Sequence, residues 1–171
     1  MATTMPKPAS KTKLHPSHIS IPEEQRIQLV DMLNKTLAAT LDLKTQVKQA
    51  HWNVKGKDFY QMHDLFDDIA EEIEAFVDLV AERATTLGGT ALGTARLAAQ
   101  NSVLKEYPHD IFNGLDHIRA LVERFGDYGA HVRENIEASE NLDDADTADL
   151  YTQISRQIDM RLWFLEAHIQ A

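Results

Sequence analysis

Residues 111–136 read IFNGLDHIRALVERFGDYGAHVRENI and contain the most regular hydrophobic pattern of the chain. Apolar residues, with one glycine among them, recur at alternating spacings of four and three residues, which places them on one face of an α-helix. A stripe of this kind is typical of the seam of a helical bundle. It consists of Ile111, Leu115, Ile118, Val122, Phe125, Gly129, Val132 and Ile136.

Residues 21–54 are predicted to form an earlier long helix. Ser20 and Glu23 have the spacing of a capping box, and Pro22 suits the first turn. Gly56 breaks the pattern after the helix. The apolar stripe of this segment consists of Ile27, Val30, Leu33, Leu37 and Leu41.

A second predicted helix begins near Asp58 and ends at Gly88 and Gly89. The link before it is short, so the first two helices should be antiparallel neighbours. The stripe of the second helix consists of Phe59, Met62, Phe66, Ile69, Ile73, Phe76, Val80 and Leu87.

Residues 88–109 form a connection that is long for a plain loop, and an Ala- and Leu-rich segment at 91–100 predicts a short helix within it. Pro108 closes the connection. The acidic stretch 141–149 ends the helix that carries the opening seam, and a last helix follows with Leu150, Ile154, Ile158, Leu162, Leu165 and Ile169. The sequence therefore predicts an all-α, ferritin-like four-helix bundle with a short extra helix in the long crossover between helices two and three. A generic helical bundle without metal is the alternative.

The composition excludes several classes of function. The chain has 171 residues and no cysteine, which excludes disulfides, thiolate zinc sites, iron–sulfur clusters and thiol catalysis. No run approaches the roughly 18 apolar residues of a membrane span, so no membrane partner is expected. The net charge of −10 repels nucleic acid and attracts cations.

The first 20 residues differ from the rest. Residues 1–20 contain Lys7, Lys11 and Lys13, several prolines, and no acidic residue. This composition predicts a flexible N-terminal arm, followed by one bundle domain over residues 21–171. The arm lacks the apolar run of a secretory signal, so a cytoplasmic location is expected.

Four possible metal ligands share one flank of the second helix. His63 and Asp67 are one turn apart, as are Asp78 and Glu82, and all four lie within about 100° of arc. Asp67 and Asp78 are separated by about 16 Å along the helix, so one ion cannot bind both pairs of one chain. A second, antiparallel copy could bring its Asp78 and Glu82 opposite the first pair. The spacing thus suggests a two-fold dimer with two identical interface sites.

His51 lies five full turns after Leu33 on the first helix and so points along its apolar stripe, with Trp52 beside it. His and carboxylate are the only strong metal ligands that this chain offers. The alternative to a metal site is that the acidic residues form a solvated helix face and that His51 is an ordinary core residue. The one Glu-x-x-His string, Glu106 to His109, contains a proline and lies in the crossover, which disfavours an iron site inside one bundle.

A series of motifs extends over nearly the whole chain after the arm. It comprises His51-Trp52-Asn53-Val54-Lys55-Gly56, then Phe59, His63, Asp67 and Asp78, then Ala81-Glu82-Arg83, Leu87-Gly88-Gly89, the stretch Asp110 to Asp116, Asp146-Thr147-Ala148-Asp149, and Trp163-Phe164. Together these motifs resemble the Dps family, the DNA-binding proteins from starved cells, or mini-ferritins.

The resemblance implies a hollow homo-oligomeric shell of twelve subunits with an iron-oxidising centre at each dimer interface. It assigns His51, His63 and Asp67 to one subunit, and Asp78 and Glu82 to its two-fold partner. It implies that Fe²⁺ reduces hydrogen peroxide in preference to oxygen and that Fe³⁺ mineralises in the cavity. Imidazole and carboxylate ligands suit Fe²⁺, with zinc as a possible competitor.

Three further expectations keep their alternatives. Trp52 could donate electrons when iron is short, or simply pack at the dimer interface. The acidic run could line an entry pore at a three-fold axis, or favour a helix N-terminus; it consists of Asp143, Asp144, Asp146 and Asp149. DNA binding through the lysine-containing arm should be weak, because the chain is acidic and phosphate contacts weaken with salt.

Two other functions remain open at this stage. One is a DNA-compacting nucleoid protein with secondary metal binding. The other is a structural cage that binds zinc or other ions without turnover.

Overall fold

Five helices and their connections make up the fold in a computed structural model that describes residues 12–170. The described residues contain no strand. The helices are α1 (Glu23–Asn53), α2 (Phe59–Thr86), α3 (Ala95–Asn101), α4 (Gly114–Glu140) and α5 (Ala145–Glu166). The predicted all-α architecture, with one short helix in the crossover, is therefore confirmed.

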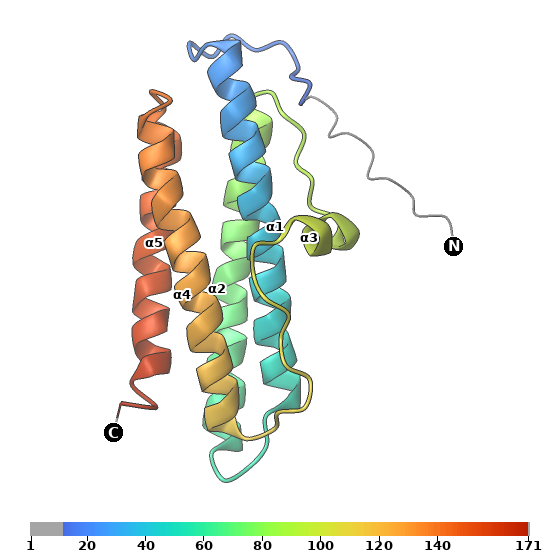
Figure 1. The fold of residues 1–171 in the computed structure, drawn as a ribbon, viewed down its shortest axis with the longest axis vertical. Coiled ribbons are helices and arrows are strands. Elements are labelled where there is room, and N and C mark those ends of the chain that lie inside the picture. The colour runs from blue at the N-terminus through green and yellow to red at the C-terminus, as the bar shows by residue number, and fades with distance from the viewer. Residues whose placement is uncertain (1–11, 171) are drawn as a thin grey trace, which may run out of the picture.

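The four long helices run side by side along the long axis of the molecule (Figure 1). Residues 54–58 turn α1 into its antiparallel neighbour α2, and residues 141–144 turn α4 into α5. The crossover between α2 and α4 descends the full length of the bundle, and α3 lies against α1. This connectivity is the single long crossover that was predicted.

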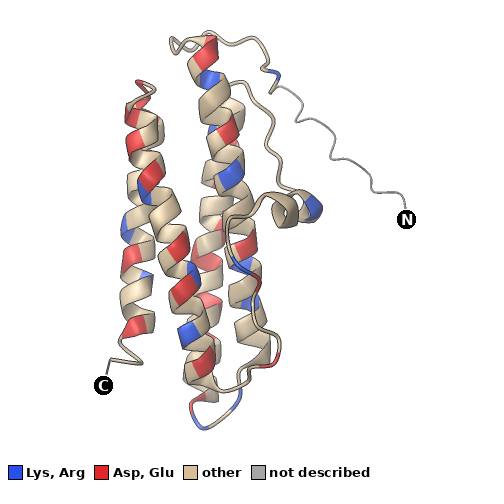
Figure 2. Ribbon diagram, in the orientation of Figure 1, with Lys and Arg blue, Asp and Glu red and all other residues tan. Residues whose placement is uncertain are grey.

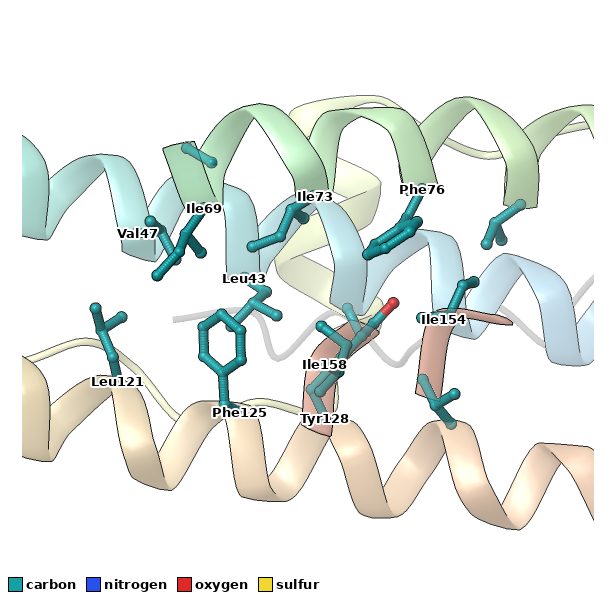
Figure 3. Packing of buried hydrophobic residues seen from close by; sticks show 14 of the residues in the cluster. Leu43, Val47, Ile69, Ile73, Phe76, Leu121, Phe125, Tyr128, Ile154 and Ile158 are labelled. Carbon is teal, nitrogen blue, oxygen red and sulfur yellow. The ribbon is translucent and has the colours of Figure 1, made fainter. Parts of the chain in front are cut away.

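One continuous hydrophobic core fills the space between the four long helices (Figure 3). Residues of α1 and α2, such as Val47 and Ile73, face residues of α4 and α5, such as Phe125 and Ile158. The predicted stripes supply most of this core. Phe59 is an exception, because its side chain is 44% exposed at the first residue of α2.

The start of α1 differs from the prediction. Pro22, and not Ser20, is the N-cap residue, and no side chain caps this end of the helix, so the predicted capping box is wrong. Tertiary hydrogen bonds fix the helix start instead. Buried Arg26 donates from Nε to the carbonyl of Ile21 at 3.1 Å and from Nη1 to the carbonyl of Leu87 at 2.8 Å.

The last connection is also shorter than predicted. Helix α5 begins at Ala145, inside the stretch 141–149 that was expected to separate the helices. Asp144 caps it by accepting a hydrogen bond from the backbone N–H of Thr147, which satisfies a donor that would otherwise lack a partner. The run of acidic residues thus begins a helix as well as ending one.

Part of the predicted N-terminal arm can be described. Residues 1–11 lie outside the described range, whereas residues 12–20 pass along α1 and the end of α2 without forming a helix. The backbone N–H of His15 donates to the carbonyl of Gly88 at 2.7 Å. Gly88 has a φ of +91°, and a Cβ atom there would lie 2.8 Å from the carbonyl oxygen of His15. Glycine is therefore required at this contact.

Charged residues are distributed along the long helices (Figure 2). None of the helices within residues 12–170 combines the length and apolar character needed to cross a bilayer. The crossover is tied to α1 by polar contacts: Ser102 donates to the carboxylate of Asp42 at 2.5 Å, and Gln46 donates to the carbonyl of Lys105 at 3.0 Å.

Candidate metal centre

His51 and His63 hold each other where the end of α1 meets the start of α2. The Nδ1 atom of His51 lies 2.8 Å from the carbonyl oxygen of His63, and Nδ1 of His63 lies 2.9 Å from the carbonyl oxygen of His51. The two rings stack with centroids 3.7 Å apart. As predicted, His51 faces inward and is only 8% exposed.

These reciprocal contacts determine the tautomer of both rings. A carbonyl oxygen only accepts hydrogen bonds, so the hydrogen of each neutral imidazole lies on Nδ1. The Nε2 atom of each ring therefore keeps its lone pair and is available as a metal ligand. Fixing one ring nitrogen by a backbone carbonyl is the usual way in which proteins orient a ligating histidine.

Asp67 lies one turn after His63 on α2, and its carboxylate is engaged by a lysine. Lys48 Nζ donates to Asp67 Oδ1 at 2.5 Å, and the same oxygen lies 4.0 Å from Nδ1 of His51. The hydrogen bond from Lys48 is the largest cause that holds the pKa of Asp67 below its ordinary value. Asp67 is therefore ionised at neutral pH and able to bind a cation.

Asp78 and Glu82 lie further along α2, with exposed side chains. Neither forms an ion pair or side-chain hydrogen bond among the described residues of one subunit. Within residues 12–170, no group of three or more histidine and carboxylate side chains in a single subunit is arranged to hold a metal ion. His51 and His63 are in contact and Asp67 Oδ1 lies 4.0 Å from His51 Nδ1, but these three predicted ligands are not arranged as a metal site within one subunit. Asp78 and Glu82 lie further along α2.

Trp52 lies on the outer side of the same region and is 67% exposed. Its side chain lines a surface cavity of about 590 Å³ between α1 and α2, together with Lys48, Asp67 and Glu71. Lys48 Nζ lies 6.0 Å from the centre of the indole ring. The cavity places the indole beside the carboxylate of a predicted ligand.

Lys48 is a residue of this site that was not predicted from the sequence. It precedes His51 by three residues and so lies on the same face of α1. That spacing could have drawn attention to it, because a cation one turn from a predicted ligand must affect a metal site.

The four predicted pore residues have different surroundings at the end of the bundle where α4 passes into α5 (Figure 2). Asp144 is only 2% exposed, and both of its oxygens accept from Arg83 Nη2, at 2.8 and 2.9 Å. Asp143, Asp146 and Asp149 are exposed. The carboxylate of Asp144 is thus buried and engaged within its own subunit. The other three are exposed, although Asp146 lies 3.9 Å from Arg83 Nη1 and Asp143 accepts from Gln25 at 3.5 Å.

Burial alone would raise the pKa of Asp144. Hydrogen bonds from Thr147 and Arg83 outweigh that effect and hold the pKa below its ordinary value. Arg83 directly follows Glu82 in α2 and also donates from Nε to Thr147 Oγ1 at 2.9 Å. The end of α2 that carries Glu82 is therefore bound to the start of α5.

Comparisons with known proteins agree with this architecture. The sequence family described as the ferritin-like domain matches residues 30–171. The chain is 40% identical over 158 residues to the DNA protection during starvation protein of Agrobacterium fabrum, covering 92% of this chain and 98% of that protein.

Two solved structures from Streptomyces coelicolor are similar in fold. DpsA14 superposes with a TM-score of 0.90 at 26% identity and covers 95% of this chain and 96% of that chain. DpsC superposes with a TM-score of 0.88 at 28% identity, with 92% of each chain covered. The match over the ferritin-like domain, the 40% identity and these folds together show that the chain belongs to the Dps family of ferritin-like proteins.

Proposed function

We propose that the protein is a mini-ferritin that oxidises Fe²⁺ with hydrogen peroxide and stores the Fe³⁺ product inside a shell of twelve subunits. Family membership supports iron storage and protection of DNA as the general role. The observation that carries the proposal is the His51–His63 pair, whose reciprocal bonds leave the Nε2 lone pair of each ring free, with Asp67 Oδ1 4.0 Å from Nδ1 of His51. Imidazole with carboxylate is a donor set that suits iron.

The site would be completed across a two-fold axis. His51, His63 and Asp67 form half of a donor set on one subunit, and Asp78 and Glu82 of the partner subunit would supply the other half. Antiparallel packing of two copies would account for Asp78 and Glu82, which form no ion pair among the described residues of their own subunit. It would also cover the exposed Trp52.

Two ferrous ions bound together would deliver both electrons that one peroxide molecule needs to become water. Pairing the electrons avoids the one-electron reduction that releases hydroxyl radical. The chain contributes the imidazoles that orient the ions and the carboxylates that stabilise the higher charge of Fe³⁺. Asp143, Asp146 and Asp149 would attract Fe²⁺ at the end of the bundle, since three exposed carboxylates in several copies concentrate cations.

The test is a stoichiometry measured without oxygen. Metal-free protein is loaded with Fe²⁺, limiting peroxide is added, and oxidised iron, soluble iron and trapped radical are measured. We expect about two irons oxidised per peroxide, little radical, and iron that stays soluble with the protein. A rate and radical yield equal to those of a protein-free control would refute the proposal.

A mixing experiment tests the shared site. His51→Ala and Asp78→Ala should each slow oxidation, because each removes one ligand. Co-assembled hybrids of the two variants should regain part of the activity, since one interface site of each hybrid dimer keeps all its ligands. Confirmed hybrids without rescue would refute a site shared between subunits. A cage that binds ions without turnover would show no effect of either substitution.

A further inference from the structure

Tyr107 and His117 form a buried pair that the proposed iron chemistry does not use. Tyr107 comes from the crossover and is 4% exposed, and His117 comes from the first turn of α4 and is 1% exposed. The Tyr107 hydroxyl oxygen lies 2.8 Å from Nδ1 of His117, and the two rings are nearly parallel with an interplanar angle of 9°.

The surroundings of His117 determine the direction of this hydrogen bond. Nε2 is buried and has no hydrogen-bond partner among the described residues. If Nδ1 donated to Tyr107, both the phenolic hydrogen and the Nε2 lone pair would be buried without partners, whereas donation by Tyr107 leaves only the hydrogen on Nε2 unpaired. Tyr107 is therefore the donor and Nδ1 of His117 the acceptor. Burial is the largest cause that holds the pKa of His117 below its ordinary value, so the imidazole is neutral.

The pair lies against both helices that carry the predicted ligands. His117 lies near the backbone of Asn53, two residues after His51 on α1. Its ring also meets Phe66, which follows His63 by one turn on α2, with ring centroids 6.3 Å apart. On the other side, Tyr107 lines a surface cavity of about 710 Å³, where the Arg124 guanidinium lies 5.7 Å from its ring centre.

The other two buried tyrosines lack such a direct base. The hydroxyl of Tyr128 bonds to Thr40 Oγ1 at 2.7 Å, and Thr40 donates its own hydrogen to the carbonyl of Thr36, which cannot take up a proton. Tyr151 reaches the imidazole of His131 only through the hydroxyl of Thr36, across two contacts of 3.0 Å each. Tyr128 is thus an internal control for Tyr107.

We propose that Tyr107 is a redox-active tyrosine that gives up one electron to a one-electron oxidant while its phenolic proton passes to Nδ1 of His117. A hydroxyl radical that takes this electron becomes hydroxide, and the pair becomes a neutral tyrosyl radical beside an imidazolium. A further Fe²⁺ returns the electron and becomes Fe³⁺, and His117 returns the proton. One stray radical is thereby reduced at the expense of one ferrous ion.

The burial that keeps His117 neutral favours return of the proton once an electron is available, so the radical is transient. The inference depends on the proposed function only for the source of the oxidant, which would be a hydroxyl radical formed when a single ferrous ion meets peroxide. Its test therefore uses no iron, and its result does not depend on the ferroxidase proposal.

The experiment uses metal-free, full-length protein carrying Tyr60→Phe, because Tyr60 is 72% exposed and would be oxidised directly. Azidyl radicals from pulse radiolysis oxidise exposed indoles such as Trp163, which is 61% exposed, and the appearance of tyrosyl radical is followed by absorbance and by electron paramagnetic resonance. We expect Tyr107→Phe to remove most of the tyrosyl signal and Tyr128→Phe to leave it unchanged. A signal that survives Tyr107→Phe, or that never forms in the parent, would overturn the proposal.

Two measurements separate proton acceptance from structural support. His117→Gln should lower the tyrosyl yield several-fold while the helical circular dichroism stays unchanged. In the parent protein, in which Tyr107 and His117 are both intact, the tyrosyl radical should form more slowly in D₂O than in H₂O, because the proton moves with the electron. Absence of a solvent isotope effect would overturn the role of His117 even if a variant at that position failed to fold.

Discussion

The ammonium group of Lys48 lies 2.5 Å from Asp67 Oδ1, so a protein cation is bound at a carboxylate that is predicted to ligate iron. The contact joins α1 to α2 one turn from both His51 and His63. A metal ion that takes Oδ1 of Asp67 as a ligand displaces this ammonium, and one that takes Oδ2 binds beside its positive charge. In both cases Lys48 opposes binding of the metal.

Removing Lys48 should strengthen metal binding. We expect Lys48→Met to raise the affinity for Zn²⁺, a redox-inactive probe, by a few-fold at most, since an exposed ion pair is weak. Titration calorimetry on metal-free protein measures this change. Lys44→Met is the matched control, because Lys44 pairs with Glu74 between the same two helices without touching a predicted ligand. Equal affinities in both variants would contradict the competition.

The buried pair of Arg83 and Asp144 should contribute to stability. We expect Asp144→Asn to lower the free energy of unfolding by about 3 kcal/mol, because it leaves a largely buried guanidinium without its partner. Denaturant unfolding followed by circular dichroism measures the loss. Asp159→Asn serves as the control, since Asp159 forms a similar but exposed pair with Arg133 and should cost less than about 1 kcal/mol.

The contribution of the Arg83–Asp144 pair to the free energy of unfolding should depend on pH. The folded state holds the pKa of Asp144 below its ordinary value of 3.8. The ionised carboxylate therefore stabilises the fold fully above pH 3.8, and this stabilisation is lost as the pH falls through the lower pKa of the folded state. The difference in stability between the wild type and Asp144→Asn should therefore shrink below about pH 4. A difference that stayed constant down to pH 2 would argue against an ionised Asp144 as the cause.

The exposed carboxylates at the start of α5 should speed the entry of iron. We expect the double variant Asp146→Asn, Asp149→Asn to slow Fe²⁺ uptake at low ionic strength, with a smaller effect at high salt, because the attraction is electrostatic. Stopped-flow absorbance on the assembled protein follows uptake. Asp110→Asn removes an exposed carboxylate from the crossover and should leave the rate unchanged. Equal rates of Fe²⁺ uptake in the wild type, the double variant and Asp110→Asn would exclude entry of iron past Asp146 and Asp149.

Binding to DNA should depend on the first residues of the chain. Deleting residues 1–11 removes Lys7 and Lys11 and keeps the segment that contacts Gly88. We expect the full chain to shift DNA in a gel only at low salt, and the shortened chain not to shift it, because phosphate contacts are screened by salt. Retention of the shift after deletion would place DNA binding elsewhere, and a shift that persisted at physiological salt would favour the DNA-compacting function.

The arrangement of the helices could be predicted because long amphipathic patterns leave few alternatives. Ile118, Phe125 and Val132 of the predicted seam are buried on α4 as expected, and the inward position of His51 followed from its spacing to Leu33. Helix ends were less predictable. The start of α1 depends on Arg26 reaching the carbonyl of Leu87, far away in sequence, and no local pattern encodes that contact.

Parts of the site were unpredictable for the same reason. The pairs Lys48–Asp67 and Tyr107–His117 each depend on how two elements cross in space. In the sequence, Asp144 cannot be distinguished from the neighbouring acidic residues, whereas in the structure it is buried against Arg83. Residues on one helix face can be grouped from sequence, whereas contacts between elements require the structure.

The reciprocal bonds between His51 and His63 have a consequence for how such a chain evolves. Each ring is held by the backbone carbonyl of the other residue, and every amino acid supplies such a carbonyl. Replacing one histidine therefore removes the stacking of the rings but keeps the hydrogen bond that orients the survivor. The two positions can change one at a time, and a descendant that lost one histidine would still hold the other with its Nε2 atom free for a ligand.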